Sequence, residues 1–414
     1  MRGPRGNVLR RYARVAAALA LILHLAGVSV AAYNLNWAVG DMRQPALAGG
    51  TSCPQRARFD VATPGTIHRR WSTVVDISPV TILTADQSPA GRLAEIETAV
   101  QRSFAGWTSV PGTLLKPSSL DTLQRTSVQA ACSTLDGLNS ICFSQNDAAF
   151  TPGVLAFTRV VIADLAGEQL SPVTLPSTFV GEILDADVQL RPGDNSVKFA
   201  TPAVLATNPT AYDLESILTH ELGHVFGFSH SAVWRAMMFP FAPPPGQFTG
   251  SRPTAQSPDA PLSDDDRTGL RVLYPDPGES TYAGSIRGRI LPANPLMLPV
   301  SPVGVTGVYP AQVVAIDNGT GALLTATVGG WSCTGAGPVR FDGSYVLERL
   351  PVSASQAYQV YVEPLGAPVT PAAILGPSTA ICRNAATDPG WPAQYACLVP
   401  PLVVPFSARL RPGP

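Results

Sequence analysis

The stretch HELGHVFGFSH, from His220 to His230, holds three of the five histidines in this 414-residue chain. His220 and His224 are four positions apart, so on a helix they lie on one face, about one turn apart. Gly227 allows a sharp turn after such a helix, and His230 can then return toward the other two rings. Three neutral imidazoles suit a zinc ion and leave its fourth position open, which is typical of a catalytic rather than a structural site. One zinc ion therefore accounts for the clustering.

Glu221 directly follows the first of these histidines, where a carboxylate can take a proton from a metal-bound water. Together the residues form H-E-x-x-H-x-x-G-x-x-H. The first five positions alone are weak evidence, because H-E-x-x-H arises often by chance. The longer pattern rarely does so in a chain this poor in histidine. The alternative, a helix with incidental surface histidines, requires that this spacing arose by chance.

The longer motif resembles that of the metzincin metallopeptidases, and further marks are similar to their matrixin branch. The segment AMMFP at 236–240 looks like the methionine-containing turn, or Met-turn, of that branch. The resemblance implies that Met238, rather than Met237, forms a hydrophobic floor under the zinc, whereas a methionine in such a place is otherwise plain core. It covers roughly residues 70–274. It implies a secreted zinc endopeptidase in which Glu221 assists the attack of zinc-bound water on a peptide bond.

Two further segments of the same region are similar to matrixin elements. LSDDDRTGLRVLYP resembles the C-terminal helix of the catalytic domain. By that resemblance Asp265 and Asp266 tie this helix to the Met-turn or to a trimmed N-terminus, and capping of the helix that starts after Ser263 is the alternative. GVLAF resembles the edge strand with which the family pairs an extended substrate. It implies that Leu155 and Ala156 offer backbone groups to a peptide.

The chain also departs from the animal matrixins, which hold a second, structural zinc with further histidines. One of those positions is Phe157 here, and once an N-terminal signal is removed only His68 remains outside the motif. We therefore expect a single zinc ion. Calcium remains possible at the acidic segments 185–187 and 193–196, although turns and strand ends contain such residues routinely.

Periodicity predicts an α+β catalytic domain followed by a small all-β sandwich. Residues 91–107 place apolar side chains at helical spacing, and Asp213 can cap a second helix that ends at Gly227. Strands are expected at 153–163 and 181–192. The metzincin resemblance implies a twisted, mostly parallel sheet with an active-site helix and a C-terminal helix. The short strands beyond look like the transthyretin-type module called a carboxypeptidase regulatory-like domain, to which we assign no chemistry.

The expected divisions are a signal peptide at 1–32, an N-terminal segment or short propeptide at 33–70, the peptidase domain at 71–276 and the sandwich at 281–414. The first of these has five arginines, then an apolar run, then small residues. An uncleaved membrane anchor is the alternative. Cleavage predicts a secreted protein, extracellular or periplasmic, with no stable membrane span.

Export would bring six cysteines into an oxidising compartment, where they can pair. Cys132 and Cys142 are close enough in sequence to close a local loop. The matrixin cysteine switch is missing, and Cys53 is the one cysteine ahead of the catalytic domain. A thiolate that caps the zinc, a disulfide and an inert thiol are the alternatives for it.

Charge gives no reason to expect binding to nucleic acid or anionic lipid, because 28 basic residues nearly balance 29 acidic ones. The expected partners of this presumed monomer are protein or peptide substrates. Two alternatives stay open: a catalytically silent binding or adhesion protein that works through its C-terminal sandwich, and a peptidase highly selective for one protein. Glu221 counts against the first, because a structural site has no use for that carboxylate. Substrate, cleavage preference and latency are not given by these patterns.

Overall fold

The structure is a computed structural model that describes residues 37–38, 55–61, 73–76, 82–83, 85, 89–115, 123–124, 139–143, 150, 153–163, 166–169, 176–191, 197–231, 233–292, 307–308, 311–330, 332 and 342–363. The expected signal peptide at 1–32 and the chain beyond 363 lie outside these residues. So do Cys53, Cys132 and the three C-terminal cysteines. The expected disulfides therefore stay predictions.

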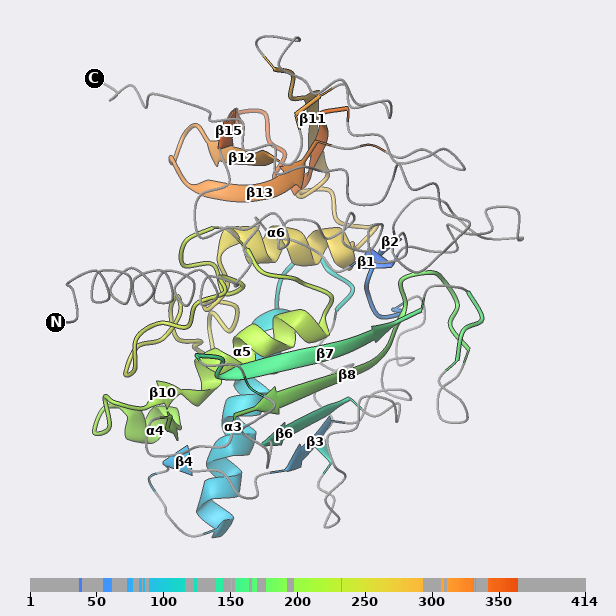
Figure 1. Cartoon of the computed structure of the whole chain (residues 1–414). Helices are drawn as coiled ribbons and strands as arrows, with labels where there is room; N and C mark the ends of the chain where they lie inside the picture. Colours follow the sequence, from blue (N-terminus) through green and yellow to red (C-terminus); the bar gives the residue numbers. More distant parts are fainter. Residues whose placement is uncertain are drawn as a thin grey trace, which may run out of the picture.

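A five-stranded sheet forms the centre of the N-terminal half (Figure 1). Its order is β5 (Leu123–Gln124), β3 (Thr73–Asp76), β6 (Ser140–Phe143), β8 (Ile183–Leu190) and β7 (Ala156–Ile162). Neighbouring strands run parallel except β7, which pairs antiparallel with β8 at one edge. The sheet is thus mostly parallel, and β8 is buried along its whole length.

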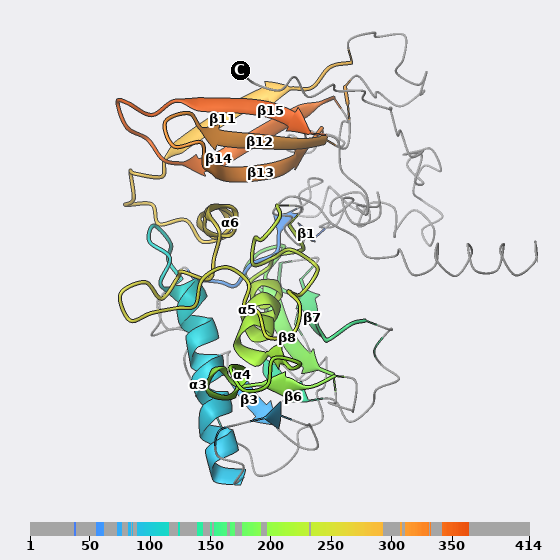
Figure 2. The same ribbon diagram turned by 90° about the vertical axis from the view of Figure 1, so that its left-hand side faces the viewer.

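Two helices pack against each other on one side of this sheet (Figure 2). Helix α3 (Pro89–Thr108) buries Ile96, Val100, Phe104 and Trp107, the apolar positions that the sequence periodicity picks out. Helix α5 (Leu214–Val225) crosses it, and the indole Nε1–H of Trp107 donates to the carbonyl of Thr219 at 2.8 Å. This buried bond fixes α5 against α3 beside the histidine motif.

Short elements complete the N-terminal half. A small parallel sheet has the order β10 (Tyr212–Asp213), β9 (Phe199–Ala200) and β4 (Ile82–Leu83), next to helix α4 (Pro202–Leu205). Strand β1 (Trp37–Ala38) pairs antiparallel with β2 (Gln55–Arg56). Helix α6 (Asp264–Leu273) begins at a full capping box. The Ser263 hydroxyl accepts from the Asp266 amide, and the Asp266 carboxylate accepts from the Ser263 amide.

The segment 55–61 belongs to the core of the unit that contains α3, α5 and α6, which is named the catalytic unit because the sequence predicts a peptidase domain there. Ala57 and Phe59 are buried in the main apolar cluster, and Arg58 bridges to Glu182 at the start of β8. The hydroxyl of Tyr274 accepts from the Phe59 amide at 3.1 Å and donates to the Phe226 carbonyl at 2.8 Å. The N-terminal segment expected at 33–70 therefore contributes residues to this core, and the boundary expected at residue 71 stays a prediction.

The described part of the C-terminal region contains strands and no helix, and the expected sandwich module at 281–414 stays a prediction. One sheet pairs β11 (Gly284–Arg289) with β14 (Ser344–Leu350), and the other has the order β13 (Leu323–Gly329), β12 (Ala311–Asp317), β15 (Tyr358–Glu363). All five strands pair antiparallel with their neighbours. Residues of both sheets form one apolar cluster that includes Val313, Ala315 and Leu347. The two layers are visible in Figure 2.

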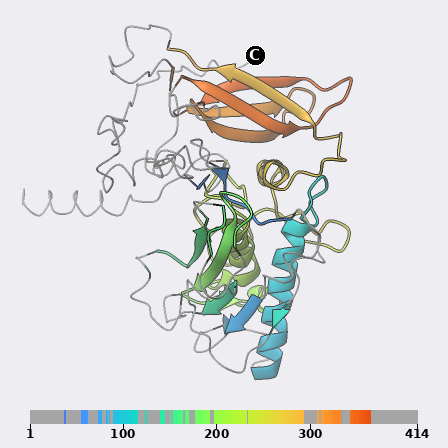
Figure 3. The same ribbon diagram turned by 90° about the vertical axis from the view of Figure 1, so that its right-hand side faces the viewer.

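This C-terminal unit lies directly on α6 of the catalytic unit (Figure 3). Helix α6 contacts β13 and β14, and Thr268 donates from its hydroxyl to the carbonyl of Leu324 at 3.3 Å. Arg56 forms an ion pair with Glu348 on β14. In the described part of the chain, no helix is long and apolar enough to cross a membrane.

Candidate metal centre

The three histidines of the motif converge on one point. Asp213 caps α5: its carboxylate accepts from the Ser216 amide at 3.0 Å, and this bond fixes where the helix begins. The ring centroids of His220 and His224 are 4.9 Å apart. The ring centroid of His230 lies 5.3 Å from that of His220 and 4.8 Å from that of His224. The three potential ligand atoms all lie within 4.8 Å of one another. Within the described residues, these histidines form the group of three or more metal-binding side chains (histidine, cysteine, aspartate or glutamate) that is close enough together to hold a metal ion.

Backbone carbonyls orient two of the three rings. Nδ1 of His220 lies 2.7 Å from the carbonyl oxygen of Met237, and Nδ1 of His224 lies 2.8 Å from that of Phe228. A carbonyl oxygen can only accept, so Nδ1 carries the hydrogen in each ring and Nε2 keeps its lone pair. Burial is the main cause that lowers the pKa of His220 to about 3, and the nearby His224 contributes to this lowering. Both rings are therefore neutral and ready to bind a cation, which is what zinc requires.

Gly227 gives the chain its turn between the helix and the third histidine. It has a φ of +101°, and a Cβ there would lie 2.2 Å from the carbonyl oxygen of Ala57. Only glycine fits both the left-handed backbone and the close approach of the segment 55–61. The helix ends at Val225, so the chain is free to bring His230 back toward the other two rings.

Glu221 is buried beside the histidines and is held by a residue that sequence reasoning missed. The hydroxyl of Thr158, on β7, donates to Oε2 of Glu221 at 2.6 Å. Burial raises the pKa of Glu221 to about 7, while the Thr158 bond acts in the opposite direction. Such a carboxyl is suited to exchange protons near neutral pH. The single clue to Thr158 in the sequence is a hydroxyl in an edge strand that is apolar except for Thr158 and Arg159.

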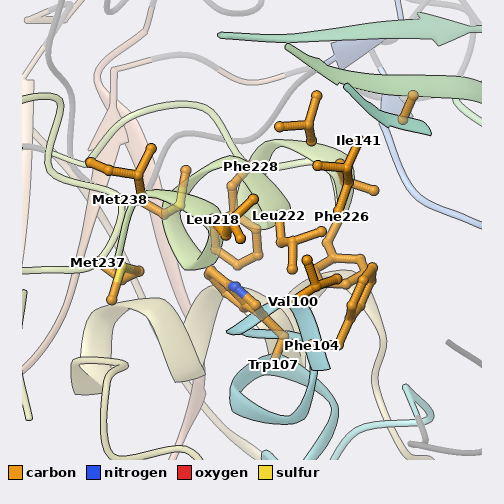
Figure 4. Packing of buried hydrophobic residues seen from close by; sticks show 14 of the residues in the cluster. Val100, Phe104, Trp107, Ile141, Leu218, Leu222, Phe226, Phe228, Met237 and Met238 are labelled. Carbon is orange, nitrogen blue, oxygen red and sulfur yellow. The ribbon is translucent and has the colours of Figure 1, made fainter. Parts of the chain in front are cut away.

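The Met-turn lies against α5, as Figure 4 shows for Met238, Leu218 and Phe228. Met238 is fully buried, and a Cβ on Gly223 would meet its sulfur at 2.1 Å and the ring of Trp107 at 2.7 Å. Gly223 occupies a variable position of the motif, between His220 and His224. Because it has no side chain, the sulfur of Met238 can approach the helix there. Met237 instead supplies the carbonyl that orients His220.

Two of the three acidic residues of α6, Asp265 and Asp266, have separate roles. The carboxylate of Asp266 accepts from the amides of Met237 and Met238 at 2.8 Å and 3.2 Å and also caps its own helix. Both alternatives considered for Asp266 thus apply together. Asp265 differs from the expectation: its Oδ2 accepts from the hydroxyl of Ser231 at 2.7 Å, and its Oδ1 accepts from the amide of Ala326 on β13 at 2.8 Å. It contacts the C-terminal unit because α6 lies between the two units.

The edge strand β7 contacts α5. Leu155, directly before the strand, and Ala156, its first residue, direct their backbone groups to opposite sides. The carbonyl of Leu155 accepts from the Arg191 amide at 2.8 Å, so it points toward β8 rather than toward a peptide. Because pairs alternate along an antiparallel ladder, the backbone groups of Ala156, opposite Leu190, point the other way. Of the two residues expected to bind substrate, Ala156 therefore keeps the suitable orientation.

Two expected departures can be located. Phe157 packs on Phe150, with ring centroids 4.9 Å apart, where animal matrixins have a zinc ligand. Asp185 and Asp187 are buried on β8, whereas residues 193–196 and His68 lie outside the described residues. Among the described residues, no group of acidic side chains is placed to hold a calcium ion.

Residues 168–275 match the matrixin family model. The matched range contains the three histidines, Glu221, Met238, Asp265 and Asp266. The chain is also 38% identical over 65 residues to Metalloendoproteinase 1 of Glycine max. That match covers 16% of this chain and 18% of the relative, so it spans less than a fifth of that protein. The matrixin match supports a metallopeptidase of this family.

Proposed function

We propose that this protein is a zinc-dependent endopeptidase of the matrixin type, with His220, His224 and His230 as the metal ligands. The observation that carries the proposal is the convergence of three ligand atoms within 4.8 Å, beside a buried carboxyl. The donor set fits zinc, because two rings are held neutral by carbonyls that accept from Nδ1. Zinc bound there would polarise the scissile carbonyl and lower the pKa of a coordinated water.

Glu221 is the proton-transfer group of this mechanism. Its pKa of about 7 lets the carboxylate accept a proton from the attacking water and then give it to the leaving amine. Thr158 holds Oε2, so the other oxygen, Oε1, is the one available to the water. A buried position excludes bulk water, which strengthens these electrostatic interactions.

The substrate would lie extended along the outer side of β7. An edge strand offers unpaired backbone groups, and an added peptide strand uses them while its side chains alternate in direction. Ala156 lies at this edge, and Thr158, two residues farther, reaches Glu221. A peptide paired with the strand would thus pass beside the proton-transfer group.

The test compares two buried glutamates of the same helix. Glu221 and Glu215 both lie on α5, and burial raises the pKa of each to about 7, but Glu215 is at the far end of the helix from the histidines. The wild-type protein, Glu221→Gln and Glu215→Gln are assayed for bound zinc and for cleavage of a diverse peptide library. We expect one zinc in all three and a loss of roughly a thousandfold or more in kcat only for Glu221→Gln.

Two results would contradict this proposal. Normal turnover by Glu221→Gln would remove the proton-transfer role, and a wild-type protein without zinc would remove the metal centre. One zinc without cleavage of any peptide would favour the selective or binding role considered from the sequence.

Export and monomeric state form part of the same proposal. An N-terminus with five arginines before an apolar run supports export. N-terminal sequencing of the protein from the culture medium and from cell fractions tests it, and a protein that begins at Met1 in a membrane fraction would point to an anchor. Sedimentation tests the monomer.

A further inference from the structure

The C-terminal unit touches the catalytic unit close to the third histidine. Asp265, on α6, is fully buried between the two units. Its Oδ2 accepts from the hydroxyl of Ser231, and its Oδ1 accepts from the amide of Ala326, on β13. Ser231 directly follows His230 in the chain. One carboxylate therefore joins the C-terminal unit to the neighbour of a candidate metal ligand.

Ser231 is itself a junction of the segment that runs from His230 to the Met-turn. Its amide donates to the carbonyl of Met238 at 2.7 Å, and its hydroxyl accepts from the amide of Val233 at 3.1 Å while it donates to Asp265. Ser231 is fully buried, so these groups have no solvent to replace a lost partner. A shift of Ser231 would move both His230 and the turn under the metal.

A second contact reaches the same segment independently. Val233 packs against the side chains of Val314 on β12 and Ala326 on β13, both fully buried. The neighbouring residue on β12, Val313, is equally buried but belongs to the cluster inside the C-terminal unit. Strand β12 thus has one face turned to the segment 231–238 and the other to its own core.

We propose that the C-terminal β unit is a working part of the metal site: through Asp265 as a positioning residue, and through Val314, it holds Ser231 and Val233 and thereby fixes His230. This inference rests on the proposed function for the identity of the metal. It assigns a task to a unit that the matrixin match, which ends at residue 275, does not include. Partners that orient a ligand commonly change metal affinity by about 10- to 100-fold.

The experiment compares Val314→Ala with Val313→Ala in the full chain. The two substitutions remove the same atoms from adjacent buried residues of one strand, but only the first removes a contact with the segment 231–238. Zinc dissociation constants are measured by competition with a chromogenic chelator, and thermal unfolding reports the loss of packing in each. We expect zinc binding about fivefold weaker in Val314→Ala and unchanged within about twofold in Val313→Ala, although both lower the unfolding midpoint.

A second pair tests the carboxylate. Asp265→Asn can still accept from Ala326 with its amide oxygen, whereas Asp265→Ala cannot, and Asp264→Ala serves as a control because that side chain is half exposed and pairs with Arg267. We expect Asp265→Ala to weaken zinc binding about tenfold, with partial rescue in Asp265→Asn and no effect in Asp264→Ala. The visible absorption spectrum of the cobalt(II)-loaded protein, which reports ligand geometry, should change in Asp265→Ala and Val314→Ala alone.

The outcomes separate this inference from the proposed function. Equal zinc affinity and equal cobalt spectra in Val314→Ala and Val313→Ala would overturn it while the metal centre stands. A wild-type protein that binds zinc but cleaves no peptide would count against a general peptidase, in favour of the selective or binding role, and would leave this inference intact. If Asp265→Ala fails to fold, the valine pair still decides.

Discussion

At the scale of single residues, the hydrogen bond from Thr158 to Glu221 is the contact with the most direct bearing on chemistry. The bond stabilises the charged carboxylate and restricts its orientation, and bonds to charged groups contribute about 1.5–3 kcal/mol. We therefore predict that Thr158→Ala lowers kcat roughly tenfold, with KM nearly unchanged, because the proton-transfer group is less well placed.

The matched control is Thr158→Ser, which keeps the hydroxyl. Loss of the bond also raises the pKa of Glu221, since the Thr158 hydroxyl lowers it in the native protein. The acid limb of the pH profile of kcat/KM should move to higher pH in Thr158→Ala and stay in place in Thr158→Ser. Identical profiles for the two variants would show that the hydroxyl has no role.

Glu215 offers a prediction on pH and stability. Burial raises its pKa from the ordinary 4.5 to about 7, the charge of Asp213 adds to the effect, and Arg102, 3.7 Å away, opposes it. The folded state therefore binds this proton more tightly than the unfolded state does. Its contribution to stability is complete below about pH 4.5 and is lost as the pH rises toward 7.

Glu215→Gln should remove this loss. We expect the variant to exceed the wild type in free energy of unfolding by roughly 1–3 kcal/mol at pH 8, with the difference shrinking toward zero near pH 4.5. Urea unfolding of both proteins at the two pH values measures it. A difference that does not depend on pH would assign the effect to packing instead.

The convergence of the three histidines could be predicted because the motif is local. His220, Glu221 and His224 share a helix whose period places them, and Gly227 and His230 follow within six residues. Thr158 is 63 residues away from its partner, so nothing in local periodicity indicates that bond. The partner of Asp265 was missed for the same reason, since Ala326 lies in another unit, 61 residues along the chain.

At the scale of elements, the contact between α5, the Met-turn and α3 depends on Gly223. An added methyl group would lie 2.1 Å from the sulfur of Met238 and 2.7 Å from the ring of Trp107. We predict that Gly223→Ala lowers the free energy of unfolding by about 1–3 kcal/mol, because overpacking outweighs the better helix propensity of alanine. Zinc affinity should fall as well, because a shift of Met238 also moves Met237 in the same turn, whose carbonyl orients the ring of His220.

Gly106→Ala on α3 is the control for this prediction. Its added methyl group would lie 3.7 Å from the nearest atom, the carbonyl oxygen of Pro258, which is ordinary contact. We expect a change within about 1 kcal/mol, and in the stabilising direction. Chemical denaturation of both variants measures the contrast, and equal losses would mean that the tight approach at Gly223 relaxes without cost.

Several elements could be predicted from periodicity, and their pairing could not. The helix expected at 91–107 is observed at Pro89–Thr108, and the strands expected at 153–163 and 181–192 contain β7 and β8. The segment 55–61 is too short to show such a period: it contains the two-residue strand β2, and beyond it Arg58 bonds to Gly181 and Ile183 and the Phe59 amide bonds to Tyr274. Its packing in the core could therefore not be predicted from the sequence, which indicates only an N-terminal segment or short propeptide.

At the scale of the whole molecule, the C-terminal unit and the catalytic unit share an interface instead of meeting through a linker. The interface combines the Asp265 bond to Ala326, the Thr268 bond to Leu324, the ion pair of Arg56 with Glu348, and the apolar contact of Val233. Buried hydrogen bonds and apolar contacts of this kind are lost together when either side unfolds.

We therefore predict that the zinc-loaded protein unfolds in a single calorimetric transition whose van't Hoff and calorimetric enthalpies agree. Val313→Ala, a cavity in the core of the C-terminal unit, should lower the midpoint of that one transition, because loss of the C-terminal unit exposes α6 and the segment 231–238 of its neighbour. Two transitions, of which Val313→Ala moves only one, would contradict this coupling. The catalytic unit would then keep its metal after the C-terminal strands had unfolded, and the contacts through Asp265 would have to be weak ones.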